Sequence, residues 1–215
     1  MKRRSTAIAT LSLLLAIGAV GFYIAAQSTA VAGDAQQAEK TDEKPGLPEA
    51  PAWTLEDQDG KEHSLSDYRG KYVVLEWVNH GCPFVVKFYR PGQMQKWQEH
   101  YTDNGIVWMT ICSSAPGKQG YNDAEGWRRV IEEKGVKSTA TLIDADGTVG
   151  RAYGATHTPQ FAIINPDGKL IYNGAIDSIR STNSDDIEKA DNYMTTVLDA
   201  ALLKRTRAYG CTIKY

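Results

Sequence analysis

Residues 72–89 read YVVLEWVNHGCPFVVKFY, and this stretch decides the fold class. Tyr72–Val78 is almost continuously apolar, which is typical of a strand that is buried on both faces of a sheet. A loop then leads to Cys82, and Pro83 suits the first position of a helix. The stretch therefore predicts a buried strand, a loop that ends in a cysteine, and a helix that starts directly after it.

The remainder of the body alternates strands and helices. Turn signals such as Asn104-Gly105 separate the apolar runs. The apolar residues from Ile187 to Leu202 recur at three- and four-residue spacing, which predicts a last helix with Ser184 as its cap. The predicted strands are 53–55, 72–78, 106–112, 140–143, 160–164 and 169–172, and the predicted helices start at Pro83 and cover 93–101, 123–133, 148–153 and 187–202. This alternation predicts an α/β fold with helices on both faces of a sheet.

The composition is that of an ordinary globular protein. Of the 215 residues, 42% are hydrophobic and 23% are charged, which excludes a collagen-like, coiled-coil or wholly disordered chain. Three cysteines are too few for a disulfide scaffold or a four-cysteine zinc site. The formal charge is −2, and it becomes −5 (21 basic and 26 acidic residues) if residues 1–32 are removed. A mildly acidic surface argues against nucleic acid or an anionic membrane as the main partner.

The first 32 residues have the pattern of an export segment. Lys2-Arg3-Arg4 is followed by an uncharged, mostly apolar run from Ala7 to Ala26, and Ala30-Val31-Ala32 fits a signal peptidase site. If it is not cut, the run of about 20 residues is long enough to anchor the chain in a bilayer. Residues 1–32 are therefore expected to be a signal peptide or a membrane anchor. In a Gram-negative cell, either outcome predicts a periplasmic protein, in a compartment where disulfides persist.

The polar segment 33–50 contains Pro45 and Pro48 and is expected to be a flexible linker. A single domain over residues 51–205 follows, and then a tail, residues 206–215, which contains Cys211.

The predicted chemistry centres on Cys82. A helix N-terminus carries partial positive charge and free N–H groups, which favour the thiolate form of a cysteine placed there. Because the thiolate is the nucleophilic form, strand–loop–Cys–Pro–helix predicts a reactive cysteine. The alternative is a small buried side chain that happens to precede a helix.

The chain from about Trp53 to Asn173 resembles the thioredoxin-like redoxins of the alkyl hydroperoxide reductase and thiol-specific antioxidant superfamily. The matching segments are 53–57, 60–65, 70–75, the loop around Cys82, Tyr153-Gly154 and Thr158-Pro159. The segments GCPFV (81–85), SSAPGKQG (113–120) and YGC (209–211) resemble a less studied redoxin subgroup. The resemblance implies a thioredoxin-like fold, with a central mixed sheet and helices on both faces.

Two elements follow from the resemblance by position. Thr158-Pro159 matches the pair in which the family keeps a cis proline that faces the reactive sulfur and docks an incoming chain; the alternative is an ordinary trans proline. Glu76 matches a buried acid that handles a proton, and burial would raise its pKa; the alternative is a solvated glutamate at an edge. His80 is expected to flank or polarise the thiolate, and His80 and Pro83 are included among the substrate-docking residues.

Departures from the family patterns are equally informative. Thioredoxins have a second cysteine where this chain has Val85, so a CxxC exchange is excluded. Peroxiredoxins have proline, threonine and arginine where this chain has Leu75, Asn79 and Thr158. The threonine and arginine bind and polarise peroxide, and their absence argues against efficient peroxidase activity.

A second thiol therefore has to come from elsewhere. Cys112 ends a strand expected beside Tyr72–Val78, on the same edge as Cys82, and Cys211 lies on the tail. We favour a Cys82–Cys211 pair, because a tail can adjust to disulfide geometry and a strand end cannot. Cys112 would then be a packed free thiol, and a Cys82 without a resolving partner is the third possibility.

Three functions remain open. The first is an extracytoplasmic thiol-disulfide oxidoreductase with Cys82 as nucleophile, Cys211 as resolving thiol and Glu76 as proton carrier; the second is a thiol peroxidase with an atypical pocket; the third is a non-catalytic binding module.

The expected partners are protein thiols or disulfides, or a small oxidant, together with a thiol reductant. No cofactor is expected, and no metal, because His80 and Cys82 are only two ligands. Residues 113–120 are expected to form an ordered wall beside the site.

Overall fold

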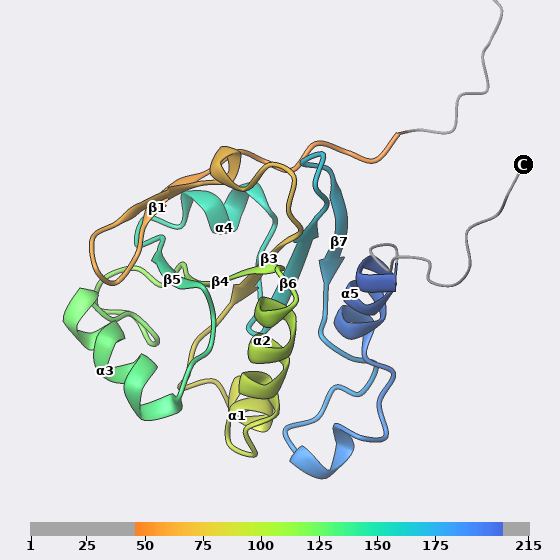
Figure 1. The fold of residues 1–215 in the computed structure, drawn as a ribbon. Coiled ribbons are helices and arrows are strands. Elements are labelled where there is room, and N and C mark those ends of the chain that lie inside the picture. Colours follow the sequence, from red (N-terminus) through yellow and green to blue (C-terminus); the bar gives the residue numbers. More distant parts are fainter. Residues whose placement is uncertain (1–45, 204–215) are drawn as a thin grey trace, which may run out of the picture. The chain divides into compact units, whose positions relative to one another are not determined.

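A five-stranded mixed sheet forms the centre of the fold (Figure 1). The structure is a computed structural model, and it describes residues 46–203. The strand order is β5-β4-β3-β6-β7, with β3 parallel to β4, β4 parallel to β5, and β6 antiparallel to both β3 and β7. The strands are β3 (Val73–Trp77), β4 (Val107–Cys112), β5 (Ala140–Ile143), β6 (Gln160–Ile164) and β7 (Leu170–Gly174). The predicted α/β fold is confirmed.

The central strand β3 is buried on both faces, as its apolar run predicts. Val74 and Val78 belong to one buried cluster, whereas Val73, Leu75 and Trp77 belong to the other. This alternation follows from the two-residue period of a strand. Glu76, which has the same parity as Val74, therefore points into the first cluster.

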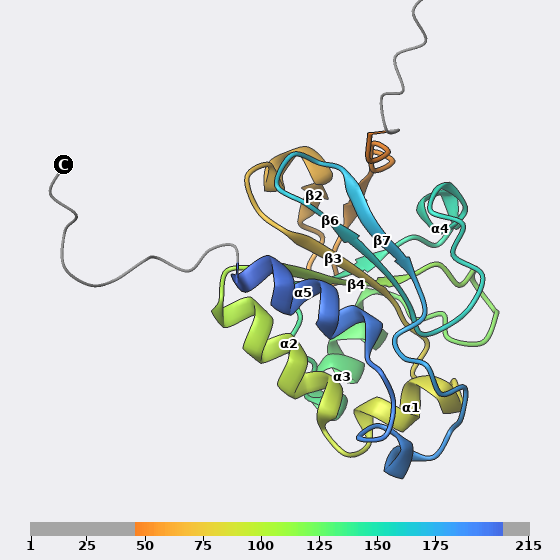
Figure 2. The same cartoon turned by 90° about the vertical axis from the view of Figure 1, so that its right-hand side faces the viewer.

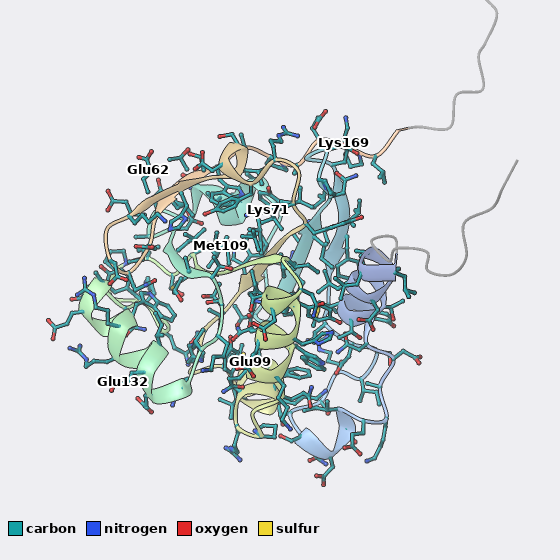
Figure 3. All side chains as sticks on the ribbon, viewed as in Figure 1. Glu62, Lys71, Glu99, Met109, Glu132 and Lys169 are labelled. Carbon is teal, nitrogen blue, oxygen red and sulfur yellow. The ribbon has the colours of Figure 1, made fainter. Side chains whose placement is uncertain are left out.

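The helices divide between these two clusters (Figures 1 and 2). Four helices contribute buried side chains on the Glu76 side: α1 (Pro83–Tyr89), α2 (Gln93–Asp103), α3 (Ala124–Lys134) and α5 (Tyr193–Leu203). The opposite face is covered by α4 (Thr148–Ala152), the hairpin of β1 (Thr54–Glu56) and β2 (Glu62–Ser64), and the 3-10 helix η1 (Leu65–Tyr68). Charged side chains such as Glu62, Glu99 and Glu132 lie outside these layers, and Met109 lies within the sheet (Figure 3).

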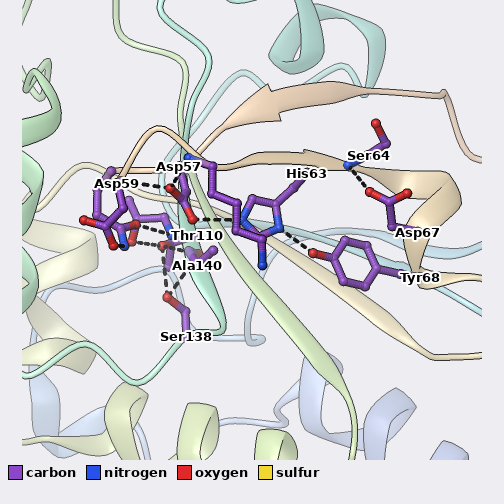
Figure 4. Close-up of polar contacts among 12 residues, drawn as sticks. Asp57, Asp59, His63, Ser64, Asp67, Tyr68, Thr110, Ser138 and Ala140 are labelled. Carbon is purple, nitrogen blue, oxygen red and sulfur yellow. Dashed lines mark hydrogen bonds and ion pairs between the residues drawn. The ribbon is translucent and has the colours of Figure 1, made fainter.

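The hairpin on the second face is held by a buried polar chain (Figure 4). His63 Nε2 lies 2.8 Å from Asp57 Oδ2, and His63 Nδ1 lies 2.5 Å from the hydroxyl of Tyr68. Asp57 also accepts hydrogen bonds from the N–H groups of Asp59 and Lys61. Burial would raise the pKa of Asp57, but these hydrogen bonds outweigh it and hold the pKa below its ordinary value.

The last helix starts later than the sequence predicts. Ser184 begins only a 3-10 turn, η2 (Ser184–Asp186), and α5 begins at Tyr193. Asn192 is held in an antiparallel bridge with Asp177, and its side chain accepts a hydrogen bond from the N–H of Thr195. The bridge fixes extended backbone just before α5, so the periodic apolar residues before it do not become helical.

The last residues of the predicted linker pair with the body of the domain. Leu170 donates its N–H to the carbonyl of Pro48, and Ala50 donates to the carbonyl of Gly168. Within the segment 33–50, residues 48–50 are therefore paired with the β6–β7 hairpin. The predicted export segment 1–32, the linker up to residue 45 and the tail 206–215 lie outside the described residues. Among residues 46–203, no helix is long and apolar enough to cross a membrane.

Candidate active site

Cys82 lies at the N-terminus of α1, where the sequence predicts it. It is the N-cap residue, it is partly exposed, and Pro83 is the first helical residue. Its Sγ lies 3.2 Å from the carbonyl oxygen of Thr158, to which the thiol donates a hydrogen bond. The Thr158-Pro159 peptide bond is cis, as the resemblance implies. The fold thus brings together two segments that are 76 residues apart in the sequence.

Glu76 is fully buried beneath this site. Its carboxylate accepts hydrogen bonds from the hydroxyl of Tyr89 (2.9 Å), from Gln98 Nε2 (3.0 Å) and from Trp108 Nε1 (2.8 Å). Burial raises the pKa of Glu76 to about 7, although the three donors oppose this shift. The alternative of a solvated glutamate is wrong, and Glu76 changes its charge near neutral pH.

His80 connects the cysteine loop to this buried network. Its ring meets the ring of Tyr89 edge-on at 4.5 Å and that of Trp127 at 5.9 Å between centroids. Burial lowers the pKa of His80 to about 4, and the charge of Lys134 acts in the same direction. His80 is therefore neutral at pH 7, and polarisation of a thiolate by a positive imidazole is not expected at that pH.

Residues 113–120 lie against the cysteine loop. A Cβ at Gly120 would come within 2.6 Å of the side chain of Asn79, and one at Gly81 would lie 3.3 Å from that of Gln119. Asn79 also accepts a hydrogen bond from the N–H of Gly81 at 2.9 Å. The predicted wall is thus in contact with the loop, and Asn79 shapes that loop from within.

Cys112 is a packed thiol. It ends β4, beside β3, and its side chain is buried, with Sγ donating a hydrogen bond to the carbonyl of Gly120 at 3.3 Å. Burial raises the pKa of Cys112, against the opposing effect of hydrogen bonds with Ser114. This thiol is therefore protonated at neutral pH. Cys211 lies outside the described residues.

A cavity of about 460 Å³, which the sequence does not predict, lies beside Thr158 and Pro159. One wall comes from the connection between β7 and α5, which Lys87 holds: its Nζ donates to Asp177 Oδ2 at 2.9 Å and to the carbonyl of Ile179 at 3.1 Å. The only signal in the sequence is a lysine on the buried face of α1, next to Phe88. A buried lysine needs an anionic partner, but nothing local indicates Asp177.

The described residues hold no group of three or more His, Cys, Asp or Glu side chains arranged to hold a metal ion.

A family profile described as Redoxin matches residues 44–194. The chain belongs to the Redoxin family. This redoxin is 28% identical over 170 residues to the thiol-disulfide oxidoreductase ResA of Bacillus subtilis (strain 168), a match that spans 79% of this chain and 84% of ResA. The region that the Redoxin profile matches, residues 44–194, includes Glu76, Cys82, Thr158 and Pro159.

Solved structures give the same fold. An uncharacterised conserved protein from Geobacillus kaustophilus is 26% identical, with a TM-score of 0.63 over 75% of this chain and 84% of that one. A hypothetical protein from Sinorhizobium meliloti is 23% identical, with a TM-score of 0.58 over 73% of this chain and 86% of that one. The redoxin therefore has a thioredoxin-like fold, with the mixed sheet and the helices on its two faces described above.

Proposed function

We propose that this redoxin is an extracytoplasmic thiol-disulfide oxidoreductase with Cys82 as its nucleophile. The observation that carries the proposal is the position of the Cys82 sulfur, at the start of α1 and 3.2 Å from the carbonyl that precedes the cis proline. The Cys82 sulfur is partly exposed, so a substrate disulfide can approach it. The similarity to ResA supports the same class of reaction.

The backbone at Thr158 offers a docking edge. Within residues 46–203, the N–H of Thr158 has no hydrogen-bond acceptor. An extended partner chain can use this group as an added strand would, which directs its sulfur towards Cys82. Thr158 and Pro159 are therefore assigned to substrate docking, with His80 and Pro83 on either side of the cysteine.

The exchange proceeds in two balanced steps. The Cys82 thiolate attacks one sulfur of a substrate disulfide, so that a mixed disulfide forms and one substrate thiolate leaves. Cys211, as its thiolate, then attacks the Cys82 sulfur, which forms a Cys82–Cys211 bridge and releases the second substrate sulfur as a thiolate. The substrate is reduced, the redoxin is oxidised, and an external dithiol reductant resets the cycle.

Cys211 is the preferred second thiol because Cys112 is unsuited to the role. Cys112 is held protonated by burial and donates its proton to the carbonyl of Gly120. A thiol that attacks has to be ionised and accessible. Val85, at the position of the thioredoxin second cysteine, is fully buried and has no thiol.

Glu76 is assigned to proton transfer during resolution. Its pKa of about 7 lets it both accept and release a proton at neutral pH. The hydroxyl of Tyr89 contacts Glu76, and the Tyr89 ring contacts His80, two residues before Cys82. The network therefore reaches from the carboxylate to the cysteine loop.

Within the family, the chain is proposed to belong to the subgroup that has the segments GCPFV, SSAPGKQG and YGC. A Cβ at Gly81 would lie 3.3 Å from the side chain of Gln119, and this proximity supports a joint role for the first two segments. Residues 1–32 are proposed as the export segment, and 206–215 as the tail that supplies Cys211. Fractionation of cells should find the protein outside the cytoplasm; recovery in the cytoplasm with Met1 retained contradicts the export proposal.

Turnover of a protein disulfide in three cysteine variants tests the function. We expect Cys82→Ser to abolish turnover, Cys112→Ser to preserve it, and Cys211→Ser to stop after one cycle with Cys82 trapped in a mixed disulfide, detected by mass spectrometry. Normal turnover in Cys211→Ser together with loss in Cys112→Ser identifies Cys112 as the resolving thiol. Peroxide consumption faster than disulfide exchange favours a peroxidase, and no thiol reaction in any variant favours a binding module.

A further inference from the structure

The outward face of α5 is apolar, which is unusual for a helix at the surface of a protein. Tyr193, Val197 and Ala200 follow one another at four- and three-residue spacing, so their side chains share one face of the helix. Tyr193 keeps 43% of its surface exposed, Ala200 is exposed and Val197 is partly buried. We call this set the outward face of α5. A contiguous exposed apolar surface is typical of a place that another chain segment covers.

The other long helices carry charged side chains on their exposed faces. α2 exposes Lys96 and Glu99, and α3 exposes Glu132, among others. In α5 the only charged residue is Asp199, and its carboxylate accepts a hydrogen bond from the hydroxyl of Tyr101 at 2.7 Å. The outward face of α5 therefore lacks the charges that keep the corresponding faces of α2 and α3 solvated.

The surface that leads into α5 and the segment that follows α5 have opposite charges. Residues 177–199 contain six acidic and two basic residues, a net charge of −4, and three of the acids, Asp185, Glu188 and Asp191, are exposed. Residues 204–215 contain four basic residues and no acidic one, a net charge of +4. This complementarity favours contact between the tail and the acidic surface over contact of the tail with a basic partner.

The length of the tail suits a return along α5. The helix has 11 residues, so it is about 16 Å long at roughly 1.5 Å per residue. If residues 204–206 reverse the direction of the chain, residues 207–211 also span about 16 Å at roughly 3.3 Å per residue. Cys211 then lies beside Tyr193, at the start of α5, and the residues after it reach the exposed acids.

The start of α5 is the end that is connected to the helix of the reactive cysteine (Figure 2). Asn192 forms an antiparallel bridge with Asp177, and Asp177 accepts a hydrogen bond from Lys87 of α1 at 2.9 Å. α1 begins directly after Cys82. A tail that returns along α5 therefore brings Cys211 to the side of the molecule on which α1 lies.

We propose that residues 207–215 dock along the outward face of α5, in the direction opposite to the helix, and hold Cys211 on the α1 side of the molecule. Their apolar side chains, Tyr209, Ile213 and Tyr215, supply the cover that this face lacks within residues 46–203. The consequence for catalysis rests on the proposed function: docking raises the effective concentration of Cys211 near Cys82, so the second step of the exchange is faster.

Paramagnetic broadening in NMR spectra locates the tail. A nitroxide is attached to Cys211 in the full chain with Cys82→Ser; Cys112 is buried, and mass spectrometry checks that it stays unlabelled. We expect strong broadening of amide signals at the start of α5 and none in the β1–β2 hairpin, which packs on the opposite face of the sheet. Broadening that is spread evenly over both regions overturns the inference, because the tail would then have no preferred site.

Matched variants assign the docking to the outward face of α5. Tyr193→Lys combined with Ala200→Lys adds two positive charges there and should remove the broadening. Glu99→Lys, on the exposed side of α2, changes the net charge by the same amount and should keep it. Urea unfolding checks that both variants are folded. Equal broadening in the two variants overturns the inference.

A mixed sample tests whether a second copy of the chain covers α5 instead. Nitroxide-labelled chain at natural isotope abundance is mixed with nitroxide-free chain enriched in nitrogen-15, so that only contacts between copies broaden the observed signals. We expect no broadening of α5 in this sample. Broadening there as strong as in the labelled chain itself overturns the inference, because the outward face would then be an interface between copies.

The rate of the second step separates this inference from the proposed function. In the chain with all three cysteines, a mixed disulfide of Cys82 with a peptide is formed, and its decay is followed by mass spectrometry. We expect the Tyr193→Lys, Ala200→Lys chain to form it at the same rate as Glu99→Lys and to resolve it about tenfold more slowly. Equal decay overturns the inference and leaves the oxidoreductase standing. Broadening at α5 without any mixed disulfide at Cys82 supports the docking and contradicts the oxidoreductase.

Discussion

At the scale of single residues, Glu76 couples the stability of the fold to pH. Its pKa is raised from an ordinary value of 4.5 to about 7, so the folded state holds this proton more tightly than the unfolded state. The stabilisation is complete below pH 4.5 and is lost as the pH rises through 7, which amounts to about 3 kcal/mol. Glu76→Gln should lack this loss, because an amide does not ionise.

Urea unfolding between pH 4.5 and 8 measures this effect. Glutamine fits the site, since the hydroxyl of Tyr89 can accept a hydrogen bond from the new amide as well as donate one. Glu99→Gln, on the exposed side of α2, is the matched control and should keep the wild-type slope. The same pH dependence in Glu76→Gln and wild type would rule out Glu76 as the titrating group.

The two cysteines that the structure describes should differ strongly in reactivity. Cys82 is partly exposed, whereas Cys112 keeps 2% of its surface and has a raised pKa. In a Cys211→Ser background, iodoacetamide should label Cys82 at least about tenfold faster than Cys112, because the Cys112 sulfur is buried and its raised pKa keeps that thiol protonated. Mass mapping follows the two rates, and denaturation with urea should bring them together. Equal rates in the folded protein would contradict the assignment of Cys112 as a packed thiol.

At the scale of elements, Gly120 tests the contact between the wall and the cysteine loop. Gly120 has a φ of +88°, and a Cβ there would collide with Asn79; Gly117 has a φ of +77° but open space around it. Either change to alanine adds backbone strain of roughly 1–2 kcal/mol. Only Gly120→Ala should also slow exchange at Cys82, because it displaces Asn79. Equal exchange rates in the two variants would mean that the wall does not influence the cysteine.

Elements also mark the limit of what the sequence predicts. Local patterns are sufficient for β5 and β6, whose bounds agree with the prediction, because turn residues and apolar runs define them directly. The start of α5 depends on a bridge between Asp177 and Asn192, which local periodicity does not contain. The burial of Glu76 likewise depends on β3 lying between β4 and β6, and the cavity depends on a contact between Lys87 and Asp177. Each feature that was missed or left open depends on pairing over a long sequence distance.

At the scale of the whole molecule, the proposed Cys82–Cys211 bridge links the body to its tail. A bridge that closes a loop of about 130 residues stabilises an unstrained fold by about 5 kcal/mol, because it restricts the unfolded chain. A structural bridge would keep this stabilisation and have a reduction potential below roughly −300 mV. A catalytic disulfide has to be exchanged with another dithiol in each cycle. The folded protein should therefore stabilise it by less than it would stabilise a structural bridge.

We therefore expect a potential above roughly −300 mV for the Cys82–Cys211 couple. Because about 30 mV corresponds to 1.4 kcal/mol for two electrons, the oxidised protein should also gain clearly less than 5 kcal/mol in urea unfolding relative to the reduced protein. Equilibration in dithiothreitol or glutathione buffers, with mass spectrometry to count free thiols, gives the potential. Cys112→Ser should have the same potential, and Cys211→Ser should show no two-thiol couple. A potential below this range, together with the full stabilisation, would identify the bridge as structural and contradict the oxidoreductase proposal.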